Sequence, residues 1–259
     1  MSPPHRAGLG RCTFAWLAVT ALLCASLWAG APRADSTAWG AAVSSGDTER
    51  LLELAGPRVD VSAGGPGGKT ALMVAAAKGN VALIDRLLEL GARVDQRNRG
   101  EGTALMYAAQ YGQVAAARHL LAAGADPDAR GAKGWTPLMI ATLKGRDQIV
   151  GLLLTRGANP NVPDMFGWTP LMRAVREERA AVARRLLVSD RTDINAVNQA
   201  GMTALHLAAA LGRLEMAKLL LAHGADPSAR DLAGQTPLMS ALEEQREDLA
   251  ELLRSVPAD

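Results

Sequence analysis

Six threonines recur along this chain at an almost constant spacing, and each begins nearly the same ten-residue phrase. They are Thr70, Thr103, Thr136, Thr169, Thr203 and Thr236, separated by steps of 33, 33, 33, 34 and 33 residues. One further step back reaches Thr37. A period of this length is typical of a stacked array of short supersecondary units, and it argues against a single core built from unrelated segments.

Each repeated phrase carries the start and stop signals of a short helix. The threonine hydroxyl can accept a hydrogen bond from the first turn, and Pro137, Pro170 and Pro237 follow directly, where a helix does not need the N–H. Nine residues after the threonine, a glycine is suited to the left-handed conformation that ends a helix. These glycines are Gly46, Gly79, Gly112, Gly145 and Gly212. A second apolar helix is then predicted, as over residues 83–88.

Helices this short are unstable alone in water, so each pair must cover its apolar side with the next pair. The leucine two residues after each threonine would then form a continuous seam. The seam residues are Leu72, Leu105, Leu138, Leu171, Leu205 and Leu238. The sequence therefore predicts an all-α helical solenoid of about six to seven units. Its end units are degenerate, because Trp39 and Arg254 replace leucines there.

Several of these phrases match the repeat of a known family. They include "TALHLAAALG" at residues 203–212, "LLAAGADPDAR" at residues 120–130 and "LLAHGADPSAR" at residues 220–230. From residue 37 to about 254 the chain resembles the ankyrin repeat family, so an ankyrin repeat domain is expected over residues 35–259. The resemblance implies a non-catalytic scaffold that binds another protein through a concave surface of loop tips and first helices.

The first 34 residues have the pattern of a secretory signal peptide. Arg6 and Arg11 precede residues 12–32, which carry no charge, and small residues surround Ala31. Because the uncharged run is nearly long enough to span a bilayer, an uncleaved N-terminal anchor is the alternative. Both readings place the repeats outside the cytoplasm. We therefore expect a bacterial protein that is periplasmic or secreted, or else anchored in the inner membrane with its repeats facing the periplasm.

The sequence offers no arrangement for catalysis, metal binding or a cofactor, and none is expected. The four histidines do not stand at metal-ligand spacing, and the two cysteines, Cys12 and Cys24, lie in the leader. His206 takes the fourth place of its phrase, where the resemblance implies a structural role. Residues 63–70 lack the first glycine of a phosphate-binding loop. The leader holds three of the 28 basic residues, and the 26 acidic residues follow it, so the near-neutral remainder gives no electrostatic reason to bind nucleic acid.

The aromatic residues are scarce, yet they cluster at the positions where the resemblance places a binding surface. Five of the six that follow the leader lie just before a threonine or four to eight residues after one. With two methionines and one arginine nearby, the predicted partner-binding residues are Tyr107, Tyr111, Trp135, Met165, Phe166, Trp168, Met202 and Arg176. Aromatic and methionine side chains are typical of interaction hot spots. The alternative is that Trp135 and Trp168 only cover their own turns.

One unit departs from the pattern in two places. Glu178 stands where the other units have the helix-ending glycine, and residues 186–195 carry the single inserted residue. Since a left-handed conformation costs a residue other than glycine about 1 kcal/mol, the first helix of this unit is predicted to run on past Glu178.

The expected partner is another exported protein, such as an enzyme, a toxin or an envelope protein. Two other functions stay open, a membrane-anchored adaptor with an uncut leader and a stack that associates with itself.

Overall fold

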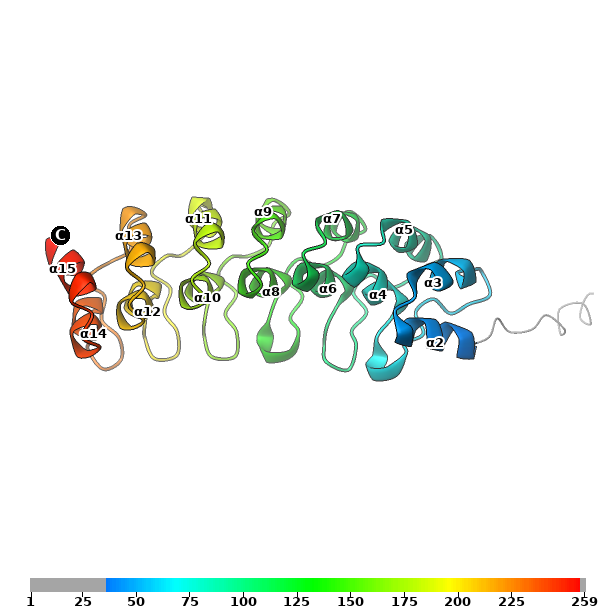
Figure 1. Ribbon diagram of the computed structural model, residues 1–259, viewed down its shortest axis with the longest axis horizontal. Helices are drawn as coiled ribbons and strands as arrows, with labels where there is room; N and C mark the ends of the chain where they lie inside the picture. The colour runs from blue at the N-terminus through cyan, green and yellow to red at the C-terminus, as the bar shows by residue number, and fades with distance from the viewer. Residues whose placement is uncertain (1–35, 257–259) are drawn as a thin grey trace, which may run out of the picture.

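The computed structural model describes residues 36–256, which form seven antiparallel helix pairs stacked in a single elongated array (Figure 1). We number the pairs as units 1–7. The first helices are α2 (Ser36–Ser45), α4 (Ala71–Lys78), α6 (Ala104–Tyr111), α8 (Pro137–Leu143), α10 (Pro170–Arg176), α12 (Ala204–Ala210) and α14 (Pro237–Glu243). The second helices are α3 (Thr48–Leu54), α5 (Val81–Glu89), α7 (Val114–Ala122), α9 (Asp147–Thr155), α11 (Ala180–Val188), α13 (Leu214–Ala222) and α15 (Glu247–Ser255). The predicted all-α solenoid is thus confirmed.

The recurring threonines cap the first helices, as the sequence predicts. In units 2–7 the threonine side chain accepts a hydrogen bond from the backbone N–H three residues later, at 3.2 Å from Thr136 to Met139 for example. Thr37 differs, because it lies inside α2. The five helix-ending glycines have positive φ angles between 65° and 77°. A local signal therefore sets the start of the first helix in units 2–7, and a glycine marks its end in five of the seven units.

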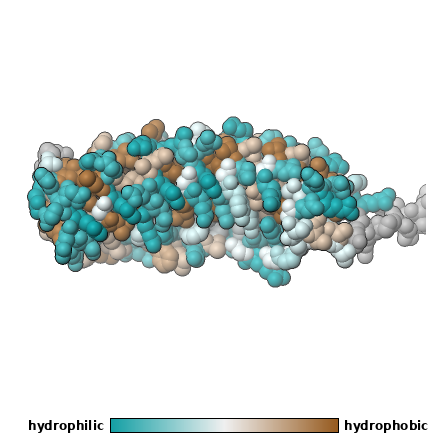
Figure 2. Space-filling view, in the orientation of Figure 1, coloured by the Kyte–Doolittle hydropathy of each residue, from teal (hydrophilic) through white to brown (hydrophobic). Residues whose placement is uncertain are grey.

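The core is the seam between successive units. Leu72, Leu105, Leu138, Leu171 and Leu205 are buried between neighbouring helix pairs, and Leu238 of the last unit is only partly buried. Trp39 takes the place of the seam leucine in unit 1 and is also buried. On the face seen in Figure 2, hydrophilic residues predominate and apolar residues show as patches between them. Each unit is therefore stabilised mainly by its neighbours.

His206 has the structural role that the sequence analysis expects. Its imidazole is fully buried, with Nδ1 at 2.9 Å from Thr203 Oγ1 and Nε2 at 3.1 Å from the carbonyl oxygen of Gln235. The histidine thus joins the start of α12 to the loop of unit 7. Methionine occupies the same place in units 2–5 and unit 7, and it is buried in units 2–5.

The loops before the threonines, which we call the fingers, project to one side of the array (Figure 1). The short 3₁₀ turns η1 (Pro66–Gly68) and η2 (Ala132–Gly134) lie in two of them. Neighbouring fingers are joined by backbone hydrogen bonds, such as Met165 N–H to the Lys133 carbonyl at 2.9 Å. Further along the loops, acidic and amide side chains accept backbone N–H groups of the next unit, as Asn195 does from Asp226 at 2.9 Å. The fingers are therefore held in register with the helices.

The predicted extension of the first helix past Glu178 is wrong. α10 ends at Arg176, and Glu178 adopts the left-handed conformation with φ 55°, as does Gln245 of unit 7 with φ 56°. The reason is that the second helix must return at the same place in every unit to meet its neighbours, so packing overrides the local cost. The Glu178 carboxylate also forms an ion pair with the guanidinium of Arg213 in the next unit, at 2.7 Å.

The predicted leader of residues 1–34 lies outside the described residues. Within residues 36–256, no helix has the length and apolar character needed to cross a membrane.

Replacing one seam leucine tests the stacking directly. We expect Leu138→Ala to lower the free energy of unfolding by about 2–5 kcal/mol, because Leu138 is completely buried and a cavity would remain. Urea denaturation followed by circular dichroism measures the change. Leu232→Ala is the control, since that leucine is 81% exposed, and a similar loss in both variants would contradict the seam.

Candidate protein-binding surface

A buried acid at the base of one finger organises the middle of the surface. Asp164 is 4% exposed, and its Oδ1 accepts the backbone N–H groups of Phe166 at 2.9 Å and Trp168 at 3.0 Å. Its Oδ2 accepts from Arg173 through Nε at 2.9 Å and through a terminal nitrogen of the same guanidinium. The carboxylate thus closes the finger and fixes it to α10 with charge-assisted hydrogen bonds.

The positions of Asp164 and Arg173, nine residues apart, are also in contact in unit 3, where other side chains occupy them. In unit 3, Asn98 Oδ1 accepts the N–H groups of Gly100 and Gly102 at 2.9 Å each, and its Nδ2 donates to the Tyr107 hydroxyl at 2.8 Å. In unit 6, Asn198 closes its finger similarly, and an apolar residue, Leu207, follows nine residues later. The finger base therefore controls which side chain of the first helix is held beneath the loop.

The tryptophan that ends the unit 5 finger lies against two cations. The guanidinium carbon of Arg173 is 4.6 Å from the centroid of the Trp168 ring, and that of Arg176 is 5.4 Å away. Both distances are typical of cation–π contacts. The predicted residues Trp168 and Arg176 therefore lie together, and Arg173, which was not among them, fixes the pair to the finger base.

Two other predicted aromatics, Tyr107 and Trp135, line a common hollow between units 3 and 4. Its volume is about 230 Å³, and its other walls include Met106, Ile140 and the glycines of the neighbouring fingers. Burial raises the pKa of the Tyr107 phenol above its ordinary value. Lys69 lies 5.5 Å above the Tyr107 ring, and Lys133 lies at the same distance from the Trp135 ring. The hollow is thus lined by two aromatic rings, and each ring has an ammonium group against it.

The remaining predicted residues are spread over the surface. Met165 and Phe166 are about half exposed on the unit 5 finger, and Met202 is half-buried against the core. Tyr111 is 52% exposed and lines a separate hollow of about 200 Å³, which it shares with Arg146 at the turn between α8 and α9. The structure therefore brings Tyr107 together with Trp135, and Trp168 with Arg176, and places Tyr111 apart. Their role in binding stays a prediction.

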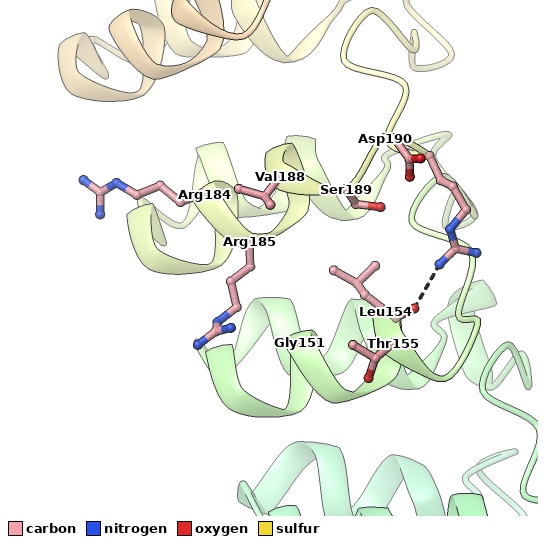
Figure 3. Close-up of a pocket in the computed structure, with 9 residues that line it drawn as sticks. Gly151, Leu154, Thr155, Arg184, Arg185, Val188, Ser189 and Asp190 are labelled. Carbon is pink, nitrogen blue, oxygen red and sulfur yellow. Dashed lines mark hydrogen bonds between the residues drawn. The ribbon is translucent and has the colours of Figure 1, made fainter.

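A further hollow, which was not predicted from the sequence, lies between the second helices α9 and α11 (Figure 3). Its volume is about 460 Å³, and Gly151, Leu154 and Thr155 of α9 line one side of it. Val188 is 80% exposed beside it, and Arg191, which also lines it, donates to the Leu154 carbonyl at 3.1 Å. A glycine inside a second helix was the available signal.

Within residues 36–256, no group of three or more histidine, cysteine or carboxylate side chains is placed to hold a metal ion. The acid with the most buried carboxylate, Asp164, is fully engaged by backbone N–H groups and Arg173. What the surface offers is aromatic rings, cations and shallow hollows.

Variants of the finger base test its role in stability. Asp164→Ala is expected to lower the free energy of unfolding by about 3–5 kcal/mol, because the Arg173 guanidinium would be left buried without its counter-ion. The double variant Asp164→Asn with Arg173→Leu recreates the Asn198 and Leu207 pair of unit 6 and should stay within about 1 kcal/mol of the wild type. Guanidinium denaturation measures both, and equal losses in the two proteins would refute this explanation.

Comparisons with known proteins agree with this architecture. The family model for ankyrin repeats in three copies matches residues 39–131, 127–198 and 185–259. Human protein phosphatase 1 regulatory subunit 27 is 39% identical over 75 residues, which are 29% of this chain and 49% of that protein. A protein described as the putative ankyrin repeat protein L271 of Acanthamoeba polyphaga mimivirus is 40% identical over 75 residues. These residues are 29% of this chain and 10% of that protein. The serine/threonine-protein kinase VIK of Arabidopsis thaliana is 38% identical over 76 residues, which are 29% of this chain and 17% of that protein.

The matched stretch thus spans about half the length of the first of these relatives and much less of the others. The family model, in contrast, extends over nearly every residue that the structure describes. The chain belongs to the ankyrin repeat family.

Proposed function

We propose that this protein is a non-catalytic scaffold that binds another protein through its fingers and first helices. The observation that carries the proposal is the pocket between units 3 and 4, where Tyr107 and Trp135 stand half-buried around a hollow of about 230 Å³. Exposed aromatic pockets of this kind are typical anchor sites at protein interfaces, because burying a ring there removes a large apolar area from water.

The neighbouring residues extend this surface toward unit 5. Trp168 and Arg176 are in cation–π contact, and Phe166 is 50% exposed at the tip of the same finger. Arg and Trp are enriched among residues that dominate binding energies. Hydrogen bonds between the fingers preorganise the surface, so binding would lose little conformational freedom. The name of the human relative, a regulatory subunit, fits a function exerted on another protein.

We propose further that the protein acts outside the cytoplasm, on an exported enzyme, toxin or envelope protein. The support is the leader pattern, in which Arg6 and Arg11 precede an uncharged run. N-terminal sequencing of the protein from the periplasmic fraction tests this. We expect the chain to begin after Ala29, whereas retention of the earlier residues would indicate the membrane-anchored alternative.

The binding surface is tested with a paired tryptophan variant. Immobilised wild-type protein should retain a specific partner from a periplasmic extract, and Trp135→Ala with Trp168→Ala should lose it while helical content by circular dichroism stays unchanged. Loss is expected because two central rings are removed at once.

The matched control carries Leu52→Ala and Val188→Ala, which remove exposed apolar side chains from the second helices α3 and α11, away from the fingers. The control should retain the partner as the wild type does. Retention of the same protein by the paired tryptophan variant would refute the site. Light scattering tests the self-associating stack. That alternative would be favoured if the molar mass of the wild type grew with protein concentration and the mass of the paired tryptophan variant did not.

A further inference from the structure

Charge is divided unevenly along the finger side of the array. The last six residues before Thr70, Thr103 and Thr136 include Lys69, Arg97, Arg99, Arg130 and Lys133, and the one carboxylate among them is Glu101. The corresponding residues of units 5–7 include a single cation, Arg230, and two carboxylates, Asp164 and Asp231. The fingers of units 2–4 therefore form a basic region, although the chain beyond the leader is close to neutral.

The cations of this basic region fall into two groups. Arg97 donates to the carbonyl oxygen of Arg130 and pairs with Glu101 at 3.1 Å, while Arg130 donates to the Pro163 carbonyl at 2.9 Å. These two arginines tie successive fingers together. Lys69, Arg99 and Lys133 form no ion pair with any carboxylate in residues 36–256. Three charges are thus available to a partner.

The two available lysines lie against the two aromatic rings of the pocket. Each ammonium nitrogen is 5.5 Å from a ring centroid, Lys69 from Tyr107 and Lys133 from Trp135. Arg99 is exposed on the finger of unit 3, which lies between the fingers that carry the two lysines. Its backbone N–H donates to the Gly67 carbonyl oxygen at 2.8 Å. An apolar side chain that entered the hollow would therefore bring its flanking residues within reach of these cations.

We propose that the partner presents an acidic segment, with one large apolar side chain that enters the pocket of Tyr107 and Trp135 and carboxylates that pair with Lys69, Arg99 and Lys133. This inference rests on the proposed function and specifies the chemistry of the partner. Complementary charge at the rim of an apolar anchor site gives orientation and a faster association rate. A nucleic acid fits less well, because it needs a long basic stripe, and the basic region ends at unit 4.

Selection from a random peptide library identifies the preferred chemistry without knowledge of the natural partner. Twelve-residue peptides displayed on phage are selected on the full-length protein, and the affinities of the enriched peptides are then measured by fluorescence anisotropy. Three variants are compared with the wild type. They are Trp135→Ala, the rim variant Lys69→Gln with Arg99→Gln and Lys133→Gln, and a charge-matched control, Arg118→Gln with Arg156→Gln and Arg184→Gln, whose exposed arginines belong to second helices or their ends.

The enriched peptides should combine aspartate or glutamate with a single aromatic or large aliphatic residue. Their affinity should fall roughly tenfold or more in the rim variant, in Trp135→Ala, and on raising the salt concentration, whereas the control should bind as the wild type does.

Each other outcome overturns a defined part of the account. Neutral or basic peptides that require Trp135 would refute the acidic partner and leave the proposed surface intact. Peptides unaffected by Trp135→Ala, or a library that yields no binder, would count against the surface itself. A single-stranded oligonucleotide that binds through the rim cations, in place of any acidic peptide, would overturn the assignment of a protein partner.

Discussion

The structure depends on one constraint, which is that a pair of helices of about two turns cannot bury its own apolar faces. Leu138 is completely buried only because the units on both sides cover it, whereas Leu238 of the last unit remains partly exposed. Stability is therefore shared between nearest neighbours along the array. The same constraint fixes the position of every first helix, and hence the spacing of the fingers that project from the array.

Because the scaffold is fixed by packing, the surface residues of the fingers and first helices are free to differ between units. The finger base illustrates this, since Asn98 with Tyr107 and Asp164 with Arg173 occupy equivalent positions and both close the loop. The first pair presents an aromatic ring to a hollow, and the second presents a cation to a tryptophan. A single architecture thus places different recognition chemistry at each step along the surface.

Much of the fold could be predicted from the sequence, because the signals repeat and are local. Threonine caps and helix-ending glycines act within a few residues, and the seam leucines recur at the same place in each unit. The structure confirms all three signals. The conformation of Glu178 was predicted wrongly, since its local cost is outweighed by the need of α11 to meet α9. Neighbouring units decide such a position, and propensity alone does not reveal it.

The candidate site was harder to anticipate, for a geometric reason. The ion pair of Asp164 and Arg173 joins positions nine residues apart on different elements, so no short motif identifies it. Tyr107 and Tyr111 share a helix, yet they line different hollows. The hollow beside Gly151 is lined by residues of two neighbouring units, so it can be recognised only after the units are superposed.

Amide hydrogen exchange on the intact chain tests the central claim of neighbour-dependent stability most directly. If each unit is held by those beside it, protection should be highest in α6, α8 and α10, which have neighbours on both sides, and should fall toward α2 and α15. Slower exchange in the end helices than in α8, or protection that ignores position along the array, would contradict the account.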